Sequence, residues 1–157
     1  MDFNVHDWNE YELDSHFIGP IFSIVNYSST KFNHFGQRDL EGVVEGIRLS
    51  GKPDGMIASG RRKPGKPFFA FQEYKRNLDP GGDPAGQALA AMLVGQSLDE
   101  EPKPLYGCYV VGNAWRFITL EGKEYAISHD FSAITDDIFD IFRILKALKQ
   151  IVIELTS

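Results

Sequence analysis

The sequence predicts an α/β fold that occupies residues 1–157 as a single domain. The length suits one domain of about 100 to 200 residues. Hydrophobic residues make up 43% and charged residues 24%, which is typical of globular proteins and unlike disordered or collagen-like chains. The hydrophobic spacing changes along the chain and predicts a helix, three strands, a helix, three strands and a final helix.

The first helix is expected over residues 8–25, where apolar side chains recur at helical spacing. Gly19 and Pro20 lie within it. We expect a kink there, because proline removes one backbone hydrogen bond and crowds the preceding turn. Residues 26–37 are mostly polar and predict a loop.

The strands are predicted by short runs of apolar residues that end at turn residues. They are expected at residues 40–50, 54–59, 67–76, 105–111, 115–120 and 124–128. Turns that contain glycine and proline separate the first three strands, so we expect these three to form an antiparallel meander.

The other two helices have recognisable starts. Asp83 suits the cap of a helix over residues 84–98, and Pro84 suits its first position. Thr135 is expected to cap the last helix, which carries an apolar stripe.

Composition and segment patterns exclude several classes of protein. A net charge of −6 argues against a protein that coats nucleic acid through charge alone. The single cysteine, Cys108, rules out an intramolecular disulfide and a thiolate-rich zinc site. No apolar stretch approaches the roughly 20 residues that span a bilayer, and the N-terminus lacks the pattern of a secretory signal. We therefore expect no membrane association and a cytoplasmic location.

Basic residues are concentrated in one part of this acidic chain. Positions 51–76 hold seven of the 16 basic residues and only two acids, Asp54 and Glu73. Four of the seven form what we call the basic turn, between the second and third strands: Arg61, Arg62, Lys63 and Lys66. Two interpretations stay open, namely a local site for an anion such as phosphate and a solvated hairpin tip.

Candidate catalytic residues lie on the second and third strands. Asp54 starts the second strand, and Glu73 and Lys75 come two residues apart near the end of the third. Because side chains alternate along a strand, Glu73 and Lys75 are expected on one face with Phe69 and Phe71. A partly buried carboxylate and ammonium are costly unless each has a partner.

Two carboxylates at short distance, Asp54 and Glu73, predict a site for Mg²⁺ or Mn²⁺, since these ions prefer oxygen ligands. Lys75 is then expected to orient the attacking water or to offset charge on phosphorus, as phosphodiester hydrolysis requires. A plainer interpretation stays open for each part. Pro-Asp-Gly is a common turn, and Glu73 with Lys75 would make a surface ion pair worth less than about 1 kcal/mol.

Further segments carry a family resemblance. The second helix contains Gln87, and the first helix carries acidic residues ahead of Ile18-Gly19-Pro20-Ile21-Phe22. Together with Pro53-Asp54 and Glu73-Tyr74-Lys75, these segments resemble the PD-(D/E)xK nuclease superfamily, and within it the N-terminal nuclease domains of type I restriction enzyme motor subunits. The resemblance covers residues 10–98 and implies a restriction-endonuclease-like core, with a mixed central β-sheet flanked by α-helices.

The resemblance also assigns the acid of the first helix. Glu10 matches this acid, because it stands ten positions before Pro20. Glu12 and Asp14 lie on the same helix and are the other candidates.

The remaining site residues follow from the same resemblance. Asp54 matches the acid of the Pro-Asp element, and Glu73 and Lys75 match the Glu-x-Lys element. Gln87 matches the helix glutamine. The implied metal ligands are Asp54, Glu73, the carbonyl group of Tyr74 and the helix acid.

The predicted function is therefore a Mg²⁺-dependent endonuclease that cleaves nucleic acid, with DNA favoured, in restriction, defence or repair. The basic turn is expected to guide the phosphate backbone. The related motor subunits carry helicase modules, so we expect a partner subunit or a dimer to handle the substrate. Two alternatives stay open. One is a module of the same fold that binds nucleic acid or protein without cleaving, and the other is a scaffold that dimerises through Ile144 and Ile153 of the last helix.

Overall fold

The computed structural model describes residues 9–76 and 82–157. Its elements follow in the order α1 (Glu10–Leu13), the π-helix η2 (Asp14–Ile18), α2 (Gly19–Val25), β1 (Phe32–Gly36), β2 (Leu40–Val44), β3 (Ile47–Gly51), β4 (Gly55–Ser59), β5 (Gly65–Lys75), α3 (Pro84–Leu98), β6 (Leu105–Val111), β7 (Ala114–Glu121), β8 (Glu124–Ile127), β9 (Phe131–Ser132) and α4 (Asp137–Thr156). Seven strands form one sheet in the order β1-β4-β5-β6-β7-β8, with β9 also paired to β7. The strands β2 and β3 form a separate hairpin.

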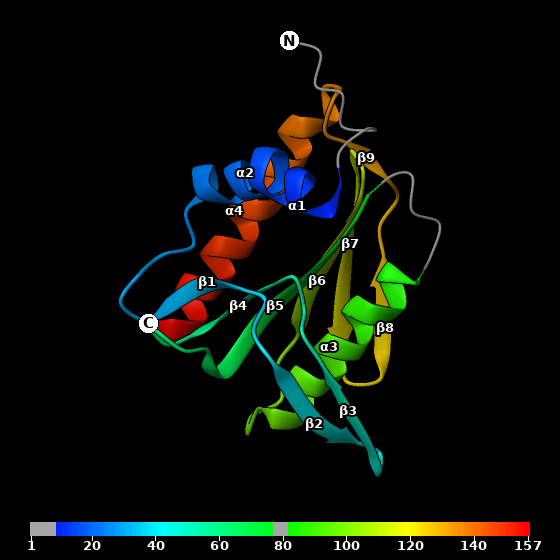
Figure 1. Cartoon of the computed structure of the whole chain (residues 1–157). Coiled ribbons are helices and arrows are strands. Elements are labelled where there is room, and N and C mark those ends of the chain that lie inside the picture. Colours follow the sequence, from blue (N-terminus) through cyan, green and yellow to red (C-terminus); the bar gives the residue numbers. More distant parts are fainter. Residues whose placement is uncertain (1–8, 77–81) are drawn as a thin grey trace.

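The large sheet separates two layers, as Figure 1 shows. The helices α1, η2, α2 and α4 cover one face, and the helix α3 with the β2–β3 hairpin covers the other. Phe22 and Trp115 belong to the core on the α4 face, whereas Phe71 and Met92 belong to the core on the α3 face. The fold is thus mixed α/β, with helices on both faces of the sheet.

The sheet is mixed because α3 connects two parallel strands. β5 pairs with β6 in parallel, and the other neighbouring strands of the described sheet pair antiparallel. A parallel pair needs a crossover connection, which α3 provides. The predicted cap is present, since Asp83 Oδ1 accepts a hydrogen bond from the Gly86 amide at 3.0 Å. The Glu-Tyr-Lys segment therefore ends a central strand.

Two parts of the predicted strand pattern were wrong. Residues 26–37, expected to form a loop, contain β1, which pairs with β4 at the edge of the sheet. Residues 40–50, expected to form one strand, contain two strands joined at Glu45-Gly46, where φ is 50° and 81°. Two positive φ angles in a two-residue loop are typical of a tight hairpin turn. The expected antiparallel meander is confirmed only for β4 and β5.

A bulge in β5 changes the predicted faces of that strand. Ile57 pairs with Ala70 and Ala58 pairs with Phe68, which leaves Phe69 as an extra residue. Phe69 packs in the α4-face core beside Ala70, whereas Phe71 packs in the α3-face core. The prediction that Phe69 shares a face with Phe71 was therefore wrong, because an inserted residue interrupts the alternation.

The first helix departs from α geometry near the expected kink. Residue 8, its predicted start, lies outside the described residues. Five residues ahead of Gly19 form η2, and the Gly19 amide bonds to the Asp14 carbonyl group. Pro20 lacks an amide hydrogen and crowds the turn before it, which accounts for the irregular turn at this point.

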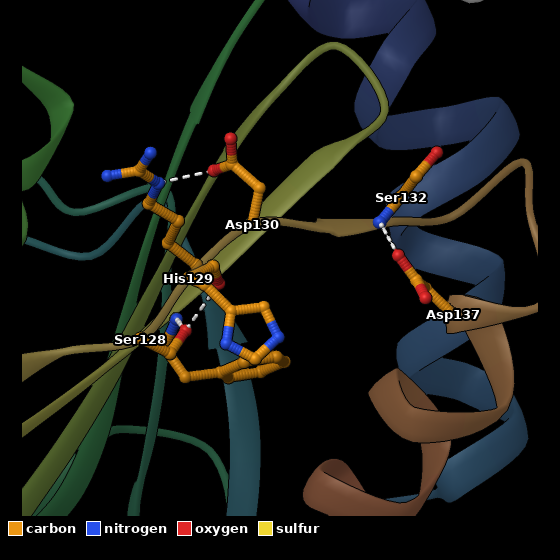
Figure 2. Close-up of polar contacts among 7 residues, drawn as sticks. Ser128, His129, Asp130, Ser132 and Asp137 are labelled. Atoms are coloured by element: carbon orange, nitrogen blue, oxygen red, sulfur yellow. Dashed lines mark hydrogen bonds and ion pairs between the residues drawn. The ribbon is translucent and has the colours of Figure 1, made fainter.

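The last helix begins two residues after the predicted cap. Thr135 Oγ1 accepts a hydrogen bond from the Asp137 amide at 3.3 Å. Asp137 Oδ2 accepts one from the Ser132 amide at 3.1 Å and so ties α4 to β9, as Figure 2 shows. Ile144 is half-buried and Ile153 is 40% exposed, and the homodimer through these residues stays a prediction. No helix in the described part of the chain is long and apolar enough to cross a membrane.

Candidate active site

The start of β4 brings Asp54 beside the Glu-Tyr-Lys segment of β5. The register pairs Gly55 with Gln72, so the next position of the same register places Asp54 opposite Glu73. Asp54 Oδ2 accepts a hydrogen bond from the backbone amide of Tyr74 at 2.7 Å. This bond orients the Asp54 carboxylate toward the middle residue of the Glu-x-Lys element.

A second carboxyl group, that of Asp14 in η2, interacts electrostatically with Asp54. Burial raises the pKa of Asp14 above its ordinary value of 3.8, and the negative charge of Asp54 raises it further. Glu12 is engaged elsewhere, because its amide and carboxylate exchange hydrogen bonds with Asn9 at 2.8 and 3.1 Å. The side chain of Glu10, the predicted helix acid, lies outside the described part of the structure. Asp14 is thus the described acid of this helix whose charge couples to Asp54.

Three carboxyl groups act on one buried phenol, and we call them the acidic cluster: Asp14, Asp54 and Glu73. Burial raises the pKa of the Tyr74 hydroxyl well above its usual value, and the negative charges of the acidic cluster raise it further. Within residues 9–76 and 82–157, no three His, Cys, Asp or Glu side chains are arranged to hold a metal ion together. The acidic cluster is therefore a set of charges that act on Tyr74 and not a preformed three-ligand cage.

A buried polar cluster of His34 and Gln72 lies against Gly55, the residue that follows Asp54. His34 Nε2 lies 3.1 Å from Gln72 Oε1, and since an amide oxygen only accepts, the hydrogen is assigned to His34. Burial lowers the pKa of His34, which keeps the ring neutral. A Cβ on Gly55 would lie 2.8 Å from His34 Nε2 and 3.1 Å from Tyr74 Oη, and it would clash with Gln72 Oε1.

Glu73 lines a cleft on the α3 side of the sheet. The cleft has a volume of about 250 Å³ and lies between the β2–β3 hairpin and α3. Gln87, predicted as the helix glutamine, lines it with Glu73, and so does Lys52. Glu73 is 9% exposed, whereas Gln87 is exposed. The fold therefore gathers Glu73 and Gln87 around one opening.

Lys75 stands where β5 leaves the sheet. Its side chain is half-buried, and its Nζ lies 3.8 Å from the position that a Cβ on Gly82 would take. Its carbonyl group accepts a hydrogen bond from the Gly112 amide at 2.9 Å, beyond the last paired residue of β6. The backbone of the Glu-Tyr-Lys segment is thus held on both sides, by β6 and by Asp54.

The basic turn lies away from these residues. It connects the end of β4 to the start of β5, whereas Asp54 precedes β4 and Glu73 is near the end of β5. Ser59 lies five positions after Asp54, and at a rise of about 3.3 Å per residue these five steps span about 17 Å. Guidance of the phosphate backbone by the basic turn stays a prediction, and it requires a substrate that extends along the strands.

Ser128, His129 and Asp130 are consecutive residues whose types suggest a catalytic relay, but Figure 2 shows a different arrangement. Ser128 Oγ donates to the carbonyl group of His129 at 2.9 Å and accepts from the Phe117 amide. Asp130 bonds to Arg116. These contacts anchor the chain after β8 and form no serine–histidine–aspartate chain.

Sequence reasoning missed His34, Gln72 and Lys52 as members of the site, and it named Asp14 only as an alternative to Glu10. A polar Gln72 within an apolar strand was the available signal for the polar cluster, and no comparable signal marks His34. Of the predicted residues, Asp54 and Glu73 lie opposite each other when the β4–β5 register is continued by one position, and Gln87 shares the cleft with Glu73. Comparison of the chain with protein-family models, with curated proteins and with solved structures gave no match.

Proposed function

We propose that this protein is a metal-dependent nuclease with a restriction-endonuclease-like core, and that it hydrolyses phosphodiester bonds of DNA. The observation that carries the proposal is the hydrogen bond of 2.7 Å between the Tyr74 amide and Asp54 Oδ2. It joins the acid of the Pro-Asp element to the Glu-x-Lys element, which is the pairing that the proposed chemistry needs. The coupling of Asp14 to Asp54 adds a third carboxyl group in support.

The donor set fits Mg²⁺ or Mn²⁺. Carboxylate and carbonyl oxygens are hard ligands, and Mg²⁺ commonly keeps several waters and takes only one or two protein carboxylates. Asp54 and Glu73 would hold the ion with the carbonyl group of Tyr74 and an acid of the first helix, without a complete protein cage. That acid is Glu10 by the resemblance, and Asp14 is the described alternative that couples to Asp54. A bound ion of this kind polarises a phosphoryl oxygen and acidifies a bound water. The repulsion between Asp54 and Asp14 favours a cation at the same place.

The other residues have separate roles in the proposed reaction. Lys75 would donate hydrogen bonds to the attacking water or to the phosphate, whose negative charge increases as the new bond forms. Gln87 would bond to the substrate from the α3 side of the cleft. The Tyr74 amide is a positioning group, because it holds the Asp54 carboxylate and contacts no substrate itself.

A second candidate function is a module that binds nucleic acid or a protein partner without cleaving. The separation of about 17 Å between Asp54 and the end of β4 favours it, because binding through the basic turn does not require the acidic cluster. The two candidates differ in one measurable property, which is metal-dependent hydrolysis.

The metal site is tested by calorimetric titration with Mn²⁺. The variant Asp54→Ala is expected to weaken Mn²⁺ binding at least about tenfold, since it removes a charged ligand. Glu124→Ala removes an exposed carboxylate on β8 and is the matched control. An unchanged titration in Asp54→Ala would remove the proposed metal site.

The catalytic assignment is tested by plasmid nicking in Mn²⁺. Lys75→Ala is expected to retain metal affinity and to lower the nicking rate by at least about 100-fold, the usual range for a positioned catalytic group. Lys146→Ala removes an exposed lysine on α4 and should nick like the wild type. A wild-type protein that binds nucleic acid but shows no metal-dependent hydrolysis of DNA or RNA would favour the second candidate.

A further inference from the structure

The cleft beside Glu73 has walls of two kinds. Its lining consists of Leu40, Leu49, Ser50, Gly51, Lys52, Pro53, Glu73, Gln87, Ala90, Ala91 and Val94. Aliphatic side chains from the hairpin (Leu40 and Leu49) and from α3 (Val94) provide apolar walls, and Ser50, Lys52, Glu73 and Gln87 provide polar groups. A phosphate group alone needs no apolar walls.

The distance between the walls is fixed by packing. A Cβ on Gly42 would lie 2.9 Å from Ser97 Oγ and 3.0 Å from Val94 Cγ1, so β2 approaches α3 as closely as a glycine allows. At the tip of the hairpin, Glu45 Oε1 pairs with Lys123 Nζ at 2.9 Å. The hairpin is thus held along α3 by close packing, and the cleft is preformed, as small-ligand sites commonly are.

The cleft matches the chemistry of an unpaired nucleobase. A base has two apolar faces and a polar edge, and proteins hold extruded bases between apolar or aromatic side chains while hydrogen bonding to the edge. The Gln87 amide both donates and accepts, so it can bond to the edge of any base. In a duplex the faces of each base are covered by its stacked neighbours, so insertion requires that the base first be unstacked.

The side chain of Lys52 places a positive charge at the same opening. Lys52 Nζ lies 3.9 Å from Asp39 Oδ1, and both side chains are more than half exposed. An exposed pair of this kind contributes little free energy, so a nucleotide phosphate can replace Asp39 as the partner of Lys52. The cleft therefore offers groups for the base and for the phosphate of one nucleotide.

We propose that this cleft receives the base of a nucleotide next to the scissile phosphate, and that the substrate is single-stranded or locally unpaired DNA. The inference rests on the proposed nuclease function and narrows its substrate class. The adjacency of Glu73 to the cleft carries it, because the same side chain belongs to the acidic cluster and to the lining.

The test measures the affinity of the full chain for a fluorescent single-stranded oligonucleotide and for its duplex, by anisotropy in Ca²⁺. The wild type is expected to bind the single strand at least about tenfold more tightly, because insertion from a duplex costs a few kcal/mol of unstacking. Ala90→Trp fills the cleft and is expected to bring the ratio of the two affinities close to one. Ala126→Trp, on exposed β8, should keep the wild-type ratio.

Ser50→Trp places the same bulk at an exposed lining position and replaces Ala90→Trp if that variant fails to fold. Equal or tighter binding of the duplex by the wild type would overturn the inference, and so would a folded Ala90→Trp or Ser50→Trp with the wild-type ratio. Hydrolysis of bis(p-nitrophenyl) phosphate by the wild type in Mn²⁺ tests the nuclease function separately. Selective binding without this hydrolysis would keep the cleft and reject the proposed catalysis.

Discussion

Gly55 is the position where a single methyl group should damage the site most. It follows Asp54 directly and lies against the buried polar cluster of His34, Gln72 and Tyr74. In Gly55→Ala the new Cβ would lie 2.8 Å from His34 Nε2 and 3.1 Å from Tyr74 Oη. Gln72, which is 1% exposed, can yield only by giving up its hydrogen bond to His34.

The expected loss of stability has two parts. Overpacking a filled interior costs about 1 to 3 kcal/mol, and a buried polar group that loses its partner costs about 1 to 3 kcal/mol. The rings of His34 and Phe22 lie 4.7 Å apart between centroids, so the imidazole has little room to move away. We expect the free energy of unfolding to fall by about 3 kcal/mol, which for a domain of this size lowers Tm by about 6 to 12 °C.

Thermal unfolding followed by circular dichroism measures this change, and Gly51→Ala is the matched control. A Cβ on Gly51 meets nothing within 4 Å, and the residue is exposed at the end of β3. The control should therefore melt like the wild type. If Gly55→Ala melted within about 1 °C of Gly51→Ala, the polar cluster would be looser than the distances indicate and the reasoning would fail.

Two further predictions concern titratable groups. The pKa of Asp14 is raised in the folded state, so the folded protein binds its proton more tightly than the unfolded chain, and the ionised carboxyl group destabilises the fold as pH rises through the folded pKa. Asp14→Asn is therefore expected to raise Tm at neutral pH and to lose this advantage below the ordinary pKa of 3.8. Thermal melting at several pH values measures the difference. An equal gain in Tm at all pH values would contradict the electrostatic explanation. Cys108 is 3% exposed, and burial raises the pKa of its thiol. A thiol reagent at neutral pH should therefore modify the native protein only as fast as the protein unfolds. Rapid modification without denaturant would contradict this prediction, because it would show that the thiol is accessible.

Local signals in the sequence were sufficient for some elements. Asp83-Pro84 marks the start of α3 because capping and a fixed proline φ act within one turn. The split of β2 from β3 at Glu45-Gly46 was missed, since apolar residues continue on both sides of a two-residue turn. The strand β1 was missed because its middle residues Asn33 and His34 are polar. Their partners are distant in sequence, and His34 bonds to Gln72 across 38 positions.

The acid of the first helix shows how far residue spacing alone defines a site residue. Glu10, which the spacing from Pro20 favours, and Asp14 are four residues apart and share a helix face. Glu10 stays a prediction, and Asp14 is the described acid whose charge couples to Asp54. The position of Asp14 depends on Gly19, because a Cβ there would lie 2.8 Å from the Asp14 carbonyl oxygen and 3.8 Å from Asp14 Oδ1. Gly19 and Pro20, which the sequence marks only as helix-disturbing residues, directly follow the π-turn that begins at Asp14, the acid whose charge couples to Asp54.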